Sequence, residues 1–145
     1  MIKINLPWYS ETSDKGNVLE NIPILLHGAV AGLILYQSAI VAPNVFRLLP
    51  PENSSLLLRT VFPSFFLTIL VLSLLSSLCS LLYLNWSTAV IGGVSASLSM
   101  VAYLLIPITN RSRDEGNNEQ FNRLHLLSVV ITLIILLLSI LVALL

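Results

Sequence analysis

Long apolar stretches alternate with short polar segments along this chain. A helix that crosses the apolar core of a bilayer needs about 20 apolar residues, and four stretches meet that length. They cover residues 23–49, 60–84, 87–106 and 124–145. None of the four contains Asp or Glu. The pattern predicts one all-α domain, an integral membrane bundle of four helices.

Three polar segments separate these stretches. Residues 50–55 begin with two prolines, which cannot continue a helix, and predict a short turn. Asn85 and the two residues after it predict a tight hairpin. Pro107 is the expected end of the third helix, and the polar residues 110–120 predict a solvated loop.

Composition agrees with a chain that resides in lipid. Hydrophobic residues make up 56% of the 145 residues and charged residues 10%, whereas a soluble domain usually carries about 25% charged residues. The mean hydropathy is +0.91. The formal net charge is +0 and the basic residues are scattered, so nothing predicts nucleic acid as a partner. The expected partners are membrane lipids and either other membrane protein subunits or further copies of this chain.

The basic residues predict an orientation, because cytoplasmic loops are enriched in Lys and Arg. The loops after the first and third stretches, with the adjoining helix ends, hold Arg47, Arg59, Arg111, Arg113 and Arg123, and the opposite side holds Lys3 and Lys15. We therefore expect a multi-pass protein of a bacterial-type inner (plasma) membrane with both termini outside the cytoplasm. Residues 1–20 lack the apolar segment of a signal peptide.

Each apolar stretch carries small or hydroxyl-bearing residues on one helical face, at spacings of three, four or seven. Such residues allow transmembrane helices to approach closely and to hydrogen-bond across the contact. The set comprises Gly28, Gly32, Ser73, Ser77, Ser80, Gly92, Ser95, Ser99, Ser128, Thr132 and Ser139. In the first stretch, Gln37 and Asn44 align at i and i+7. We interpret the small and hydroxyl-bearing residues as helix-packing residues; the alternative is a path for a substrate.

Two histidines are the other candidates for chemistry, since ionisable residues inside a membrane are functional candidates by default. His27 lies near the outer end of the first helix and His125 near the cytoplasmic end of the fourth. A rise of about 1.5 Å per residue separates their depths by about 30 Å, so the two cannot bind one metal ion or one haem iron within a monomer. No metal site or catalytic constellation is predicted.

Four helix ends meet on the predicted cytoplasmic side. They bring together Arg47, Arg59, Arg123 and His125, which are hydrogen-bond donors. The group is a candidate site for an anion or a lipid headgroup. The alternative is that the arginines only anchor the helix ends.

Three segments carry a family resemblance: His27 with residues 45–50 (Val-Phe-Arg-Leu-Leu-Pro), residues 61–66 (Val-Phe-Pro-Ser-Phe-Phe), and residues 121–128 (Phe-Asn-Arg-Leu-His-Leu-Leu-Ser). In this order and spacing the chain resembles the transmembrane protein 205-like family of small four-helix membrane proteins. It is distantly similar to copper-resistance-D-type proteins and to the four-helix haem-associated protoporphyrinogen oxidase. That oxidase has a histidine in its first span, so the resemblance implies His27 as a haem-binding candidate. The chain departs from the oxidase pattern, since no Lys or Trp accompanies His27.

Three functions remain open from the sequence. The favoured one is a non-enzymatic accessory or structural component of a membrane complex, because the chain has no buried carboxylate and no extramembrane domain. The first alternative is a transport or resistance protein for a small molecule or metal, and the second is a haem-linked membrane oxidoreductase.

Overall fold

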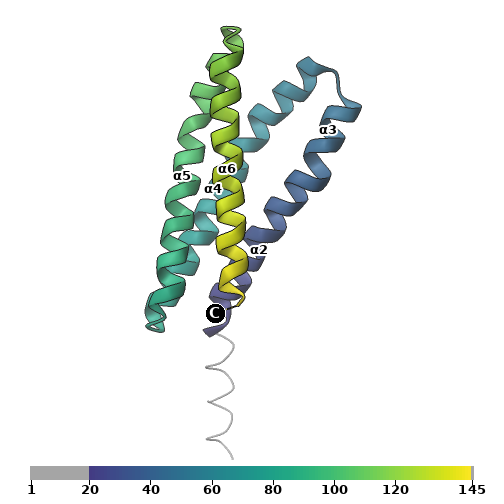
Figure 1. Cartoon of the computed structure of the whole chain (residues 1–145). Coiled ribbons are helices and arrows are strands. Elements are labelled where there is room, and N and C mark those ends of the chain that lie inside the picture. The colour runs from purple at the N-terminus through teal and green to yellow at the C-terminus, as the bar shows by residue number, and fades with distance from the viewer. Residues whose placement is uncertain (1–19, 145) are drawn as a thin grey trace, which may run out of the picture.

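The computed structural model describes residues 20–144, and all of its regular structure there is helical. The first span consists of α2 (Ile22–Tyr36), a π-helical turn (Gln37–Val41) and α3 (Ala42–Leu48). It is followed by α4 (Pro51–Leu82), α5 (Trp86–Asp114) and α6 (Asn118–Val142), as Figure 1 shows. Each of the four spans is long and apolar enough to cross a membrane. The prediction of an all-α membrane four-helix bundle is confirmed.

The helices run alternately up and down and form a ring. α4 packs against α5, α5 against α6, and α2 against both α4 and α6. Val30, Ile34, Phe66, Ile69 and Ile135 are buried together at the centre of the ring. We call them, with Phe65, Ala102 and Ile131, the apolar core.

Several predicted boundaries are wrong, and proline explains most of the differences. α4 begins at Pro51, so the predicted turn over residues 50–55 is largely helical. A proline in the first helical position lacks only an N–H that has no partner there in any case. α5 continues through Pro107 to Asp114, since proline is tolerated inside transmembrane helices.

The predicted solvated loop over residues 110–120 is also wrong, because only residues 115–117 join α5 to α6. Gly116 makes the reversal with a φ of 69°, a conformation that glycine adopts without strain. The side chain of Asn117 then accepts a hydrogen bond from the backbone N–H of Gln120 at 3.1 Å and starts α6. The expectations for residues 1–19 and for Leu145 lie outside the described residues.

The π-helical turn in the first span is explained by Pro43. Proline has no N–H, and its ring collides with the carbonyl group four residues earlier, which here is that of Ala39, inside the turn. A π-helical turn contains one residue more than the corresponding α-helical turn. The extra residue shifts by one position the residues that face the bundle. Two turns after the buried Gln37, Val45 is therefore buried, whereas Asn44 is only half-buried.

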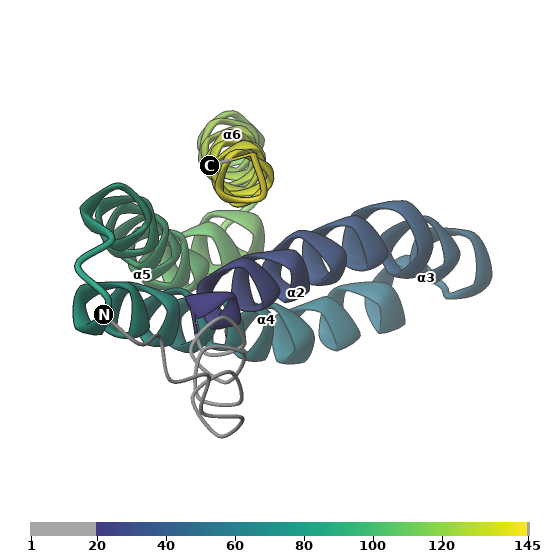
Figure 2. The ribbon, with the colours of Figure 1, turned by 90° about the horizontal axis from the view of Figure 1, so that it is seen from below.

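The two ends of the bundle differ. At the end that holds the Asn85 turn, which we call the hairpin end, all four spans lie together (Figure 1). At the opposite end, which we call the open end, α3 and the first turns of α4 diverge from α5 and α6, as the view along the bundle in Figure 2 also shows.

Candidate functional site

We call the half of the bundle next to the hairpin end the hairpin half and the other the open half. Among the described residues, His27 is the fully buried ionisable side chain of the hairpin half, where Cys79 is half-buried. His27 projects from α2 with 1% of its surface exposed. Its Nδ1 lies 3.2 Å from the Oγ of Ser139 on α6, and its Nε2 has no hydrogen-bond partner within the described protein. An unpaired polar atom away from water is costly, and in the apolar core of a membrane the cost is several kcal/mol.

The contact between α2 and α4 places Ser73 at the level of His27. The hydroxyl of Ser76 lies 3.4 Å from the carbonyl oxygen of Pro23, to which it donates. The two helices are antiparallel, so one turn away from this contact leads from Pro23 to His27 on α2 and from Ser76 to Ser73 on α4. His27 and Ser73 therefore lie at the same level. Ser73 is fully buried, and its hydroxyl also has no partner.

The contact between α4 and α5 adds a fourth residue to this level. Gly92 packs so closely on α4 that a Cβ atom would lie 2.9 Å from the backbone nitrogen of Ser77 and 3.0 Å from the carbonyl oxygen of Ser73. Ser99, two turns further along α5, donates to the carbonyl oxygen of Phe66 at 2.7 Å. Ser95 lies between these two contacts, is fully buried, and has an unpartnered hydroxyl.

Each of the four spans thus contributes one buried polar side chain at a single level. We call these four residues, His27, Ser73, Ser95 and Ser139, the polar layer. A buried hydroxyl can donate and accept, and an imidazole can donate at one nitrogen and accept at the other. The layer is therefore suited to bind water or a small hydrogen-bonding ligand.

The surroundings of the polar layer differ on its two sides. Toward the open end lies the apolar core, in which Ile69 and Ile135 are fully buried. Toward the hairpin end lie further buried polar residues, namely Ser76, Ser80 and Thr88. More hydroxyl groups are buried on the hairpin side, together with Ala89 and Val142. On the open side, the buried hydroxyl of Ser99 is already bonded to the backbone of Phe66.

The other predicted packing residues have varied surroundings. Ser77 donates to the carbonyl oxygen of Ala89 across the α4–α5 contact at 2.8 Å, and Ser80 is fully buried. Ser128 and Thr132 are half-buried and donate to carbonyl groups of their own helix. Gly28 and Gly32 are exposed, and a Cβ at either would meet nothing within 4 Å.

The four donors predicted to form an anion or headgroup site lie at the open end, each beside a different neighbour. Arg59 pairs with Asp114 on α5 through two hydrogen bonds. Arg123 pairs with Glu119 on its own helix at 2.6 Å. The exposed His125 stacks on Phe121 with ring centroids 5.9 Å apart.

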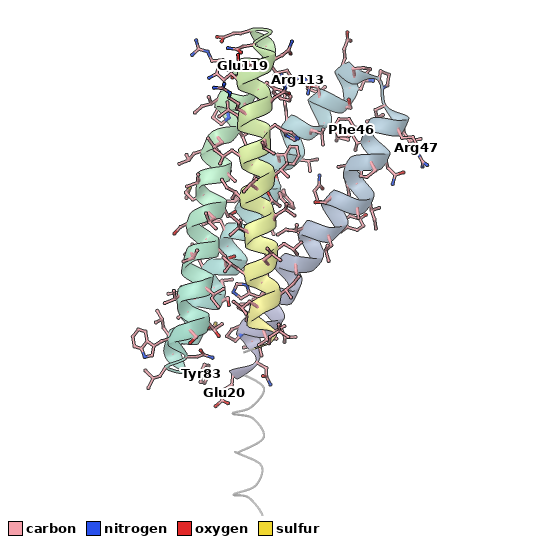
Figure 3. All side chains as sticks on the ribbon, in the orientation of Figure 1. Glu20, Phe46, Arg47, Tyr83, Arg113 and Glu119 are labelled. Atoms are coloured by element: carbon pink, nitrogen blue, oxygen red, sulfur yellow. The ribbon has the colours of Figure 1, made fainter. Side chains whose placement is uncertain are left out.

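Arg47 is separated from these groups by the divergence of α3. It donates to the side chain of Asn44 at 2.8 Å. Figure 3 shows it at the far end of α3, away from Arg113 and Glu119 near the α5–α6 turn. The structure thus brings no two of the predicted donors into a shared contact among the described residues, and the anion or headgroup site remains a prediction.

Metals and haem place different demands on these residues. The described residues contain no group of three His, Cys, Asp or Glu side chains that could hold a metal ion. The free Nε2 of His27 is the kind of atom that binds haem iron. However, only 1% of that side chain is exposed, so the helices would have to separate before a macrocycle could approach. The present packing does not fit a haem.

Gln37 is a buried polar residue that the sequence did not single out as a site. It lies in the π-helical turn where the first span leaves the bundle, is 7% exposed, and its side-chain nitrogen has no partner. The nearby Pro43 is the sequence signal that could have drawn attention to it, since π-helical turns often occur at functional positions.

A family model described as a domain of unknown function (DUF4149) matches residues 25–118, which is more than half of the chain. The match begins just before His27 and includes Ser73 and Ser95, whereas Ser139 lies beyond it. No curated protein and no solved structure matches the chain.

Proposed function

The chain belongs to the family described as a domain of unknown function (DUF4149), and we propose that it is a non-catalytic component of a membrane assembly. In this proposal a transmembrane helix of a partner protein packs beside α3 at the open end. The observation that carries the proposal is the departure of the first span from the bundle at Gln37. Beyond that residue, α3 touches the rest of the bundle mainly through a slight contact with α4.

An apolar groove and one unpartnered amide where the first span leaves the bundle support a protein partner. An apolar groove of about 380 Å³ follows this segment and is lined by Tyr36, Ile40, Val41, Asn44, Val45, Leu48 and Leu49. The amide of Asn44 is already paired, since it donates to the carbonyl oxygen of Ile40 and accepts from Arg47. The side-chain nitrogen of Gln37, buried where this segment begins, has no partner, and lipid chains offer it no hydrogen bond. A neighbouring helix can supply polar groups at membrane depth, where cross-helix hydrogen bonds add to packing.

Site-specific photo-crosslinking in native membranes tests this proposal. A photoreactive residue replaces Ile40 or Leu48, which are 51% and 68% exposed beside the groove. The matched control replaces Leu78, which is 58% exposed in the hairpin half of α4. We expect one discrete protein adduct from the first two positions and none from Leu78, together with a stable complex in mild detergent. Crosslinks to lipid alone and a lone monomer in native mass spectrometry would overturn the proposal.

Transport or resistance is the second candidate function, and the polar layer is the observation that favours it. Unpartnered polar groups from three spans at one depth form the kind of interior that a polar solute requires. His27→Ala is the variant to test for solute tolerance in cells, with the exposed His125→Ala as its control. Normal protein levels with unchanged tolerance in the His27 variant would exclude this candidate for the solutes tested.

A further inference from the structure

We infer that His27 is a proton-binding site, and that internal water held by the polar layer reaches it from the hairpin end only. The first ground is the set of unpartnered atoms. The Nε2 of His27 and the hydroxyl groups of Ser73 and Ser95 come from three helices, lie at one level, and are each without a partner in the described protein. An internal water molecule typically makes two to four hydrogen bonds to otherwise unpaired buried groups, which is what these three groups offer.

The second ground is that, once this water is present, both ring nitrogens of protonated His27 have a hydrogen-bond partner. A proton delivered by water adds to the unprotonated ring nitrogen and gives an imidazolium with two N–H donors. One N–H faces the Oγ of Ser139 at 3.2 Å, and the other faces the water shared with Ser73 and Ser95. The cation is thus hydrogen-bonded at both ends, and no other group needs to change its charge.

The third ground is the one-sided access. Ser76, Ser80 and Thr88 are buried polar residues between the polar layer and the Asn85 turn, where Ala89 and Val142 are buried as well. Ser76 and Ser80 donate to backbone carbonyl groups, and their oxygens can still accept a hydrogen bond from water. On the other side, Ile69 and Ile135 are fully buried in the apolar core, where Phe65 and Phe66 pack edge to face. Hydroxyl groups can support a file of water, whereas close-packed aliphatic and aromatic side chains exclude it.

In the part of the chain that the structure describes, no charged side chain lies next to His27 in the hairpin half. Among the described residues, the titratable side chains of α4 in this half are Cys79 and Tyr83, and α6 has none beyond His125 near its start. α5 has none before Tyr103, and α2 is flanked by Glu20 and Tyr36. The protonation state of His27 is therefore set by its burial, its hydrogen bonds and water, without an ion pair.

Nuclear magnetic resonance of the full chain in lipid bilayers tests the protonation. The chain has two histidines, so ¹⁵N-histidine labelling combined with His125→Gln leaves only the signals of His27. As the pH falls through the range in which histidines titrate, about 8 to 4, the ring nitrogens should change reversibly from the neutral to the cationic pattern. They should also show a cross-peak to water. A folded protein with neither a change nor a cross-peak would overturn the proposal.

A pair of serine variants tests the polar layer itself. Ser73→Ala combined with Ser95→Ala should remove most of the water cross-peak of His27, because the water loses two of its three partners. Ser97→Ala is the matched control, since this exposed serine donates to Gly93 in its own helix at 2.9 Å; it should leave the cross-peak unchanged. An undiminished cross-peak in the double variant, with backbone signals preserved, would show that these serines hold no water.

The direction of access is tested by the rate at which polarisation spreads from water into the protein. Ser80 and Thr88 should receive it early, whereas Ile69 and Ile135 should receive it late. Early transfer to the isoleucines would contradict the seal toward the open end. Late transfer to Ser80 and Thr88 would contradict the entrance at the hairpin end.

Discussion

The hairpin half and the open half of this bundle are built from the same four spans but pack differently. In the hairpin half, Gly92 brings α4 and α5 into backbone contact, and Ser139 of α6 meets His27 of α2. In the open half, α3 has Phe46 and Leu48 at 62% and 68% exposure. The difference shows that hydrophobicity alone does not close a membrane bundle.

The physical reason lies in the solvent. Lipid tails are as apolar as leucine, so burying a leucine against another helix yields no hydrophobic gain. Association then depends on close van der Waals contact and on hydrogen bonds between helices. The hairpin half has Gly92 and a set of serines at its contacts, whereas the open half contains Pro43, Pro63 and Pro107. Prolines remove helix hydrogen bonds and favour kinks.

The largest difference in stability should appear between two variants, in which a phenylalanine of the apolar core or one of α3 is replaced by alanine. Phe66 is 3% exposed in the apolar core and Phe46 is 62% exposed on α3. Phe66→Ala should cost about 3–5 kcal/mol of unfolding free energy because it leaves a cavity, and Phe46→Ala should stay within about 0.5 kcal/mol. Reversible unfolding in mixed micelles measures both. Equal losses would mean that α3 is packed as tightly as the core.

The glycines should give the next largest effect. In Gly92→Ala the new methyl group collides with the backbone of α4, and we expect a loss of about 1–3 kcal/mol from overpacking. Gly28→Ala is the control, because a Cβ there meets nothing within 4 Å. The same unfolding assay applies, and a Gly92→Ala protein as stable as the control would refute close packing of α4 on α5.

Removing the proline of the first span should have a smaller effect on stability and a visible one on shape. Pro43→Ala supplies the missing N–H, so the turn can regain a hydrogen bond worth about 1 kcal/mol. We expect slower hydrogen exchange around Ala39 and a changed distance between spin labels at Phe46 and Leu126. An unaltered label distance would show that α3 diverges for a reason other than Pro43.

The smallest expected effect concerns the ion pair that links α4 to α5 at the open end. Arg59 and Asp114 are partly exposed, with 33% and 58% of their side-chain surfaces accessible. Asp114→Asn should lower the melting temperature slightly in dilute buffer and not at all in high salt, since salt screens exposed pairs. A loss that persists in high salt would indicate a buried, structurally essential pair.

The sequence predicted correctly those features of the fold that depend on one helix at a time. The number of spans follows from four long apolar stretches, because each helix must satisfy its own backbone hydrogen bonds in lipid. The boundaries were less predictable. Pro51 and Pro107 were expected to stop helices, yet one begins α4 and the other lies within α5, since the effect of a proline depends on its position in the turn and on neighbouring support.

The candidate site needed the tertiary structure. The sequence placed His27, Ser73, Ser95 and Ser139 on helical faces, but the depth of one helix against another is set by contacts such as Gly92 on Ser77 and Ser76 on Pro23. Periodicity within a helix carries no information about that offset. The same holds for the predicted group of arginines, whose separation depends on the divergence of α3.

By itself, the sequence determined that this chain crosses a membrane four times and which side chains share a face of each helix, because both follow from local helix geometry and from the cost of leaving backbone groups unpaired in lipid. Only the tertiary structure decided which faces meet, at what depth, and where the bundle stays open. Those outcomes depend on contacts between residues far apart in the chain, where a single glycine or proline changes the spacing of whole helices.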